Sequence, residues 1–382
     1  MGRIRFANQL RGIAALCVAC SHLIGVFWAM PEVVSSATST PPQQGTLPGL
    51  FWLVAHTWFN LGPFGVALFF LISGLVVPFS LDRHSRSSFL LARMLRVFPT
   101  YIAALLLEVA AVSLSSHVWS RPLPFTTSIV AGNLSLLYDL FGQPSIDLVN
   151  WTLSVELKFY IAVAIMAPLV RRCSAAGIVL AGCCIFLANK MIGDVDAMPS
   201  TPSYTFSSHS LCLIYMFIGT LFNFHLRGKL GNVGLAIGVA ILSALFLSTW
   251  LAGVWRTQYP IVTVNYAYAL VLFSALYALR RQVPGNALLD GLAAISFPLY
   301  LVHSLLGYTL LKVTMVLCHL AYYPALMISF GALLVISLAL HQVFELPTQR
   351  LGQMIGKRAG STKGSHVWFW RPRRASDTAH TG

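Results

Sequence analysis

The 382-residue sequence has few charged residues: Asp, Glu, Lys and Arg make up only 9% of it, and just 11 residues are acidic. Soluble domains carry roughly 25% charged residues. A chain with so little charge and 57% hydrophobic residues cannot cover a surface that faces water. This composition excludes a soluble globular protein and predicts an integral membrane protein.

The sequence also lacks the short alternating segments of a β-barrel, a Walker phosphate-binding motif and any internal repeat. Its long apolar runs predict helices. One membrane domain is expected over residues 1–347, followed by a basic, irregular tail over 348–382. The seven cysteines lie in or beside apolar runs, and Cys17 and Cys20 have no further ligands close in the sequence. Buried packing is therefore favoured over a redox or metal role, and no metal is expected.

Hydropathy predicts an all-α polytopic membrane protein with about ten transmembrane helices. The first apolar run is too long for the core of a signal peptide, so an uncleaved helix is expected there. An irregular loop is expected over 31–49, and a short helix around 126–140. The predicted spans are 10–30, 62–81, 97–118, 151–170, 173–193, 209–226, 231–252, 261–279, 290–312 and 319–343.

The formal net charge of +14 would suit a nucleic-acid partner, but the positions of the basic residues argue against one. An even number of spans places both termini on one side, and twenty of the 25 Lys and Arg residues fall on that side. The positive-inside rule makes it the cytoplasmic side. The excess of basic residues therefore indicates how the chain is oriented in the membrane. In the tail, Trp and Arg residues suit contact with anionic membrane lipid, and a solvated tail without a role is the alternative.

Arg11 and His22 lie on the first predicted span, eleven residues apart. At about 100° and 1.5 Å per residue they share a helix face and are separated by roughly 16 Å along the axis. Arg11 is then at the cytoplasmic rim and His22 beyond the middle of the membrane. A histidine there can act as a general base. A hydrogen-bonded packing histidine is the alternative.

Glu156 lies inside the predicted span 151–170, where an unpaired charge would cost several kcal/mol. Counting residues from the outer surface places Glu156 roughly 8 Å deep and His22 roughly 12 Å deep. The two side chains are therefore expected to meet, with the carboxylate orienting the imidazole. A structural ion pair is the alternative for Glu156, but Lys158 is two positions away and points to another face.

Further polar residues of the spans are candidates for the same site. Arg93 and Arg96 share a helix face at i and i+3, and two guanidinium groups so placed can bind phosphates. A cluster that only sets topology is the alternative. Gly65 and Gly74 permit close helix approach. Additional pocket candidates are Ser73, Tyr300 and His303.

Taken together, these segments resemble the acyltransferase-3 family of membrane O-acyltransferases, which modify bacterial surface polysaccharides, Nod factors and some macrolides. The resemblance runs from residue 10 to 347. The usual family form has a second acidic residue or Gln after the Glu, whereas Leu157 and Lys158 follow Glu156 here. The matching segments are "LRGIAALCVACSHL", "FGVALFFLISGL", "RMLRVFPTY", "WTLSVELKFY", "ISFPLYLVH" and "FELP".

The resemblance implies a role for each matching residue. His22 matches the catalytic histidine of an Arg–His pair with Arg11, and Glu156 matches the acidic residue of the site. Arg93 and Arg96 match an R-x-x-R motif linked to the acyl donor.

The implied protein is an O-acyltransferase of the bacterial plasma (inner) membrane. It would have no bound cofactor and would take acetyl-CoA or another acyl-CoA as donor from the cytoplasm. The acyl group, with acetyl favoured, would pass to a hydroxyl of an extracytoplasmic carbohydrate or glycolipid, with His22 as base or acyl carrier. The alternative is a proton-coupled secondary transporter, because intramembrane Glu and His suit a proton relay. The lack of two matching halves disfavours it.

Overall fold

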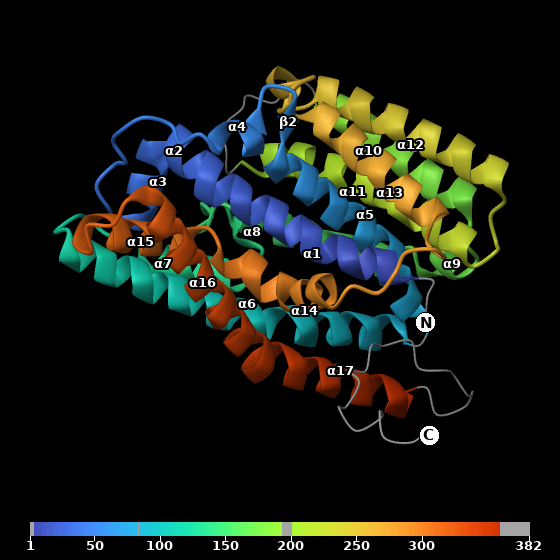
Figure 1. The fold of residues 1–382 in the computed structure, drawn as a ribbon. Helices are drawn as coiled ribbons and strands as arrows, with labels where there is room; N and C mark the ends of the chain where they lie inside the picture. The colour runs from blue at the N-terminus through green and yellow to red at the C-terminus, as the bar shows by residue number, and fades with distance from the viewer. Residues whose placement is uncertain (1–3, 83, 193–200, 360–382) are drawn as a thin grey trace, which may run out of the picture.

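The computed structural model describes residues 4–82, 84–192 and 201–359. These residues form long helices that lie side by side in one bundle (Figure 1). The strands among them are β1 (Ala55–His56) and β2 (Phe59–Asn60), which pair antiparallel. The predicted all-α polytopic membrane fold is confirmed.

The first half of the chain supplies three of the long helices. The first, α1 (Arg5–Cys20), continues through a π-helical segment, η2 (Ser21–Val26), into the short α2 (Phe27–Ala29). The other elements of this half are α3 (Pro31–Thr38), α4 (Phe51–Val54), α5 (Leu61–Leu81), α6 (Arg86–Val118), α7 (Thr127–Leu134), η3 (Tyr138–Phe141), α8 (Asn150–Ile165) and α9 (Ala167–Arg171).

The second half continues the bundle. Its elements are α10 (Ala175–Ile192), α11 (Pro202–Leu226), α12 (Asn232–Ala252), η4 (Arg256–Gln258), α13 (Thr263–Ala278), α14 (Ala287–Val302), α15 (Leu305–Lys312), η5 (Val313–Leu317), α16 (Tyr322–Leu340), η6 (His341–Glu345) and α17 (Leu346–Ala359).

Seven helices in the described part of the chain are long and apolar enough to cross a membrane. The pair α14 and α15–η5 counts as an eighth if the 76° bend between its halves lies within one span. The predicted spans 151–170 and 261–279 correspond to α8 and α13, which have only 16 residues each. Helix α8 ends at Ile165, and Pro168 lies in the first turn of the separate short helix α9, so the run predicted as one span is interrupted.

Helix α5 lies between α1 and α11, and glycines make both approaches possible. A Cβ added to Gly74 would lie 2.1 Å from the backbone oxygen of Met216, and one added to Gly219 would lie 2.3 Å from that of Leu71. On the other side, a Cβ on Gly65 would lie 2.8 Å from the backbone oxygen of Ala14. The close packing predicted from Gly65 and Gly74 is therefore confirmed.

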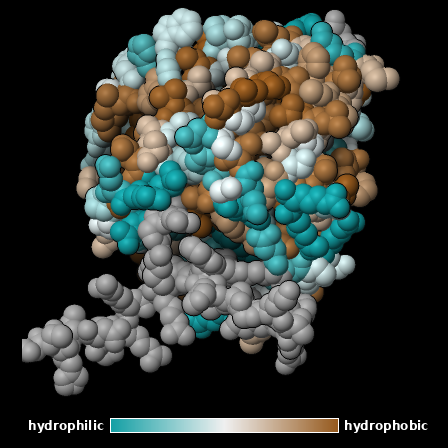
Figure 2. Space-filling view, turned by 90° about the vertical axis from the view of Figure 1, so that its right-hand side faces the viewer, coloured by the Kyte–Doolittle hydropathy of each residue, from teal (hydrophilic) through white to brown (hydrophobic). Residues whose placement is uncertain are grey.

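Burial differs strongly between helices, as expected for a bundle in lipid. In α11, 89% of the apolar window is buried, compared with 17% in α10 and 28% in α12. Apolar residues thus cover the outer helices, where lipid would contact them. Figure 2 views the bundle from the right-hand side of Figure 1 and shows hydrophilic residues gathered in the lower half of that end. The start of α1 and the end of α17 lie toward the same end (Figure 1).

Three connecting segments test the local predictions. The helix expected around 126–140 is confirmed by α7. The loop prediction for 31–49 was wrong at its start, where Pro31 occupies the first turn of α3; a proline there has no hydrogen bond to lose. The tail, predicted to be irregular from Thr348, is helical to Ala359 because α17 packs along α6, with Gly352 against Ala92. Residues 360–382 lie outside the described part of the chain.

Candidate active site

A narrow cavity of about 70 Å³ lies inside the bundle beside α5. Its wall follows α5 from Val66 to Val77, which is roughly 16 Å at 1.5 Å per residue. It brings together six of the eight predicted site residues: Arg11, Ser73, Arg93, Arg96, Glu156 and Tyr300. The other lining residues are Val66, Phe69, Phe70, Ile72, Val76, Val77, Thr152, Leu153 and Phe297.

Three arginines from α1 and α6 face this cavity. Arg93 is only 6% exposed, and its Nη2 donates a hydrogen bond of 2.8 Å to Ser80 Oγ near the end of α5. The Arg93 guanidinium also lies over the ring of Tyr160, 5.4 Å from its centroid. Arg96, one turn further along α6, and Arg11 are half-buried and line the same space. The cavity therefore carries more positive than negative charge.

Glu156 lies on the cavity wall of α8. Its Oε1 accepts hydrogen bonds from Ser73 Oγ (3.0 Å) and Tyr160 Oη (2.6 Å). Tyr160 is one turn along α8, and its ring is the one under Arg93, so the carboxylate is coupled to the arginines. The predicted contact of Glu156 with His22 is replaced by these partners. Counting residues gives depth only, whereas the rotation of α8 decides which neighbour the side chain meets.

His22 lies beyond the cavity, in the π-helical segment η2. Its Nδ1 and Tyr308 Oη share a hydrogen bond of 2.6 Å, and its ring stands edge-on to His303, with 4.9 Å between ring centroids. The neighbouring Ser21 donates to Asn60 in the β1–β2 hairpin. π-Helical turns are frequent at functional sites, because the extra residue re-aims a side chain.

His303 and Ser304 occupy the 76° break between α14 and α15. Ser304 Oγ donates a hydrogen bond to Asp147 Oδ1, which ties the break to the buried segment before α8. Sequence reasoning missed Asp147 and Tyr308. The sequence contained a signal for each of them. Asp147 is one of only 11 acidic residues, and Tyr308 follows His303 within the same apolar run.

Tyr300 connects the cavity to the two histidines. Its hydroxyl and Thr152 Oγ1 lie 2.6 Å apart across the cavity wall. Its ring contacts the His303 ring, with 5.5 Å between centroids. The cavity with its arginines and the His22–His303 pair therefore lie on opposite sides of Tyr300.

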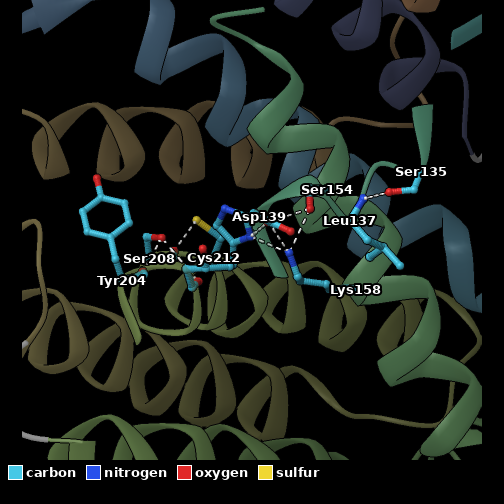
Figure 3. A network of polar contacts seen from close by, with 10 residues as sticks. Ser135, Leu137, Asp139, Ser154, Lys158, Tyr204, Ser208 and Cys212 are labelled. Atoms are coloured by element: carbon cyan, nitrogen blue, oxygen red, sulfur yellow. Dashed lines mark hydrogen bonds and ion pairs between the residues drawn. The ribbon is translucent and has the colours of Figure 1, made fainter. Parts of the chain in front are cut away.

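Lys158, which sequence reasoning left without a partner, belongs to a polar cluster on a different face of α8 (Figure 3). Its Nζ lies 2.6 Å from Asp139 Oδ2, 2.8 Å from Ser154 Oγ and 2.8 Å from His209 Nδ1. Asp139 comes from η3 and His209 from α11, so the cluster joins three elements. Both charges of α8 are thus satisfied inside the bundle, Glu156 on the cavity face and Lys158 on this one.

The fold and this site define a polytopic membrane protein with a basic internal cavity next to a pair of histidines. A family model described as an acyltransferase domain, the acyltransferase-3 model, matches residues 4–342. The chain therefore belongs to the acyltransferase-3 family and is a membrane acyltransferase.

Two named relatives fit this family. Acyltransferase MdmB of Streptomyces mycarofaciens is 25% identical over 277 residues, which cover 64% of this chain and 68% of the relative. Nodulation protein 10 of Rhizobium leguminosarum bv. viciae is 32% identical over 133 residues, 30% of this chain and 35% of the relative. No solved structure matches the chain.

Proposed function

We propose that this protein is an O-acyltransferase of the bacterial plasma membrane that takes an acyl group, most simply acetyl, from cytoplasmic acyl-CoA. The acceptor is a hydroxyl of an extracytoplasmic carbohydrate or glycosylated molecule. The observation that carries the proposal is the convergence of Arg11, Arg93 and Arg96 on a cavity inside the bundle. Three buried or half-buried positive charges need anionic partners, and Glu156 is only one negative group against these three.

The phosphates of acyl-CoA fit this requirement, because guanidinium groups bind phosphates with paired hydrogen bonds. The arginines lie toward the ends of α1 and α6 that the positive-inside rule places in the cytoplasm. From there the apolar wall formed by Phe69, Phe70 and Val66 can accept the thioester arm. Tyr300 lines the cavity and its ring contacts His303, so an acyl group in the cavity would be separated from the two histidines by this one side chain.

His22 acts in this proposal as the catalytic base or as the acyl carrier. It is half-buried, and Tyr308 holds its ring. The hydrogen bond from Ser21 to Asn60 places it close to the hairpin on the side opposite the arginines, from which the acceptor would enter. A base takes the hydroxyl proton as the oxygen attacks the thioester carbonyl, whereas a carrier forms an acyl-imidazole that the hydroxyl then attacks.

The test is mass spectrometry of surface glycans and secreted metabolites from cells with and without the gene. The expected result is the loss of one acetyl mass increment from a single product when the gene is deleted, with recovery when the gene is restored. Unchanged acylation of every glycan and metabolite would overturn the proposal.

A further inference from the structure

The hydrogen bonds of His303 fix which of its ring nitrogens carries the proton. Nδ1 lies 2.8 Å from the backbone oxygen of Tyr300 and 3.3 Å from that of Leu299. A carbonyl oxygen can only accept a hydrogen bond, so Nδ1 must be the donor. In a neutral imidazole the other nitrogen, Nε2, then has a free lone pair.

This Nε2 atom has no partner among the described residues. It is buried, and the His303 residue is 0% exposed. A buried polar atom without a hydrogen bond costs roughly 1–3 kcal/mol, a cost that a ligand donating a hydrogen bond to it would remove. An acceptor that no protein group satisfies, next to a reactive centre, points to a ligand that donates a hydrogen bond there.

The surroundings hold the imidazole in place from several sides. Its ring packs edge-on against His22 and contacts Tyr300 at the end of the cavity. The next residue, Ser304, is bonded to Asp147 across the break between α14 and α15. His22 differs in one respect: its Nδ1 partner is a tyrosine hydroxyl, which can donate or accept, so its tautomer is not fixed. Of the two histidines, His303 is therefore the one whose hydrogen bonds fix Nε2 as the unprotonated nitrogen.

We infer that His303 Nε2 is the base that takes the proton of the acceptor hydroxyl, an inference that rests on the proposed acyl transfer. As the proton moves to Nε2, the hydroxyl oxygen bonds to the acyl carbonyl carbon. The bond from that carbon to the donor sulfur breaks, and the sulfur receives the proton back from His303 and leaves as a thiol. In this route His303, and not His22, exchanges the proton with the acceptor hydroxyl and the leaving sulfur.

The first test measures the tautomer directly. Nitrogen-15 NMR of the full chain in lipid nanodiscs, with labelled histidine, reports which ring nitrogen is protonated. The expected result is an Nδ1–H signal that disappears in His303→Asn. An Nε2–H tautomer for His303 would overturn the inference, and this result does not depend on the acyl-transfer reaction.

The second test distinguishes a role of His303 as a base from a purely structural role. In His303→Asn the side-chain amide can still donate to the Tyr300 carbonyl and keep the helix break, but it offers no base. Membrane vesicles from a gene-deletion strain, carrying either the wild type or the variant, receive radiolabelled acetyl-CoA. Transfer is counted in the product that gains the acetyl increment in wild-type cells. We expect the variant to lose about 100-fold or more of the transfer rate while its KM for acetyl-CoA stays the same.

The matched control is His225→Asn. His225 is bonded to Tyr277 and Asn232 and does not line the cavity, and its substitution should leave the transfer rate unchanged. Equal transfer by wild type and His303→Asn would overturn the role of His303 alone. Absence of transfer in wild-type vesicles would overturn the proposed function itself.

Discussion

Lys158 and Asp139 form an ion pair inside the bundle, with 2.6 Å between Nζ and Oδ2. The pair joins α8 to η3 through side chains that are 19% and 8% exposed, respectively. The same helix places Thr152 and Glu156 on the cavity wall at four-residue spacing. The ion pair on another face of α8 fixes the rotation of the helix that keeps these two side chains there. The pair is therefore a structural support for the cavity wall.

Removing one partner of this pair should destabilise the protein. Lys158→Met leaves the buried Asp139 side chain with only Ser154 and His209 as polar partners among the described residues, and the loss of one partner of a buried ion pair costs about 3 kcal/mol. Replacing both residues by apolar ones, Lys158→Met with Asp139→Leu, should recover most of that loss. The measurement is unfolding in mixed micelles titrated with a denaturing detergent. Lys190→Met, at an exposed helix end, is the control. A single variant as stable as the wild type would show that the pair contributes nothing.

Arg93 and Arg96 are expected to recognise the phosphates of the donor. Arg93→Ala and Arg96→Ala should each raise the KM for acetyl-CoA by about 10- to 100-fold, because a hydrogen bond to a charged group contributes about 1.5–3 kcal/mol. Acetyl-pantetheine lacks the nucleotide phosphates, so wild type and variants should use it equally poorly. Arg121→Ala, in the groove near Ser35 and Ser39, is the control. If both variants kept the wild-type preference for acetyl-CoA, the phosphate role would be wrong.

His22 is expected to be essential for transfer but not for folding. His22→Ala should reduce acylation of the acceptor by about 100-fold or more, the range typical of a lost acid–base or nucleophilic group. Its half-buried position suggests a small effect on the yield of folded protein, which size-exclusion profiles in detergent would report. A variant that acylates at the normal rate would remove His22 from the mechanism.

The contact between α5 and α11 should tolerate no side chain at Gly74. An added Cβ would lie 2.1 Å from the Met216 backbone oxygen, so Gly74→Ala must push the helices apart. The expected cost is about 1–3 kcal/mol or more, as for overpacked cores. The control is Gly331→Ala in α16, where an added Cβ meets nothing within 4 Å. Thermal unfolding of both variants would test the difference, and equal melting temperatures would contradict it.

The sequence allowed most of the spans to be predicted, because an apolar run long enough to cross a bilayer rarely occurs outside a membrane-spanning helix. The break at His303 and Ser304 could not be seen in the same way. No proline or glycine lies at the bend, and Pro298 is contained within α14 without ending it. The bend is instead stabilised by tertiary contacts, including the bond from Ser304 to Asp147, which sequence patterns do not reveal.

The sequence pointed to several of the residues that line the cavity, but to few of the contacts that these residues make. Arg11, Arg93, Arg96 and Glu156 do line one cavity, since polar groups inside spans tend to gather where they can be satisfied. Depth along a helix gives only one coordinate, however. The rotation of α8 and the extra residue in η2 decide that Glu156 meets Ser73 and that His22 meets Tyr308.

The hydrogen bond between Tyr300 and Thr152 has a consequence for the cell that carries this protein. A site that takes its donor from one side of a membrane and its acceptor from the other, as proposed for this protein, would also be a potential leak for protons and ions. Tyr300 is 7% exposed and lies between the cavity and the histidines, bonded to α8 at its hydroxyl and in edge-to-face contact with the ring of Phe69. If donor and acceptor enter from opposite sides as proposed, Tyr300 is the side chain that separates the two entrances, and its contacts with α8 and α5 would limit the passage of ions between them.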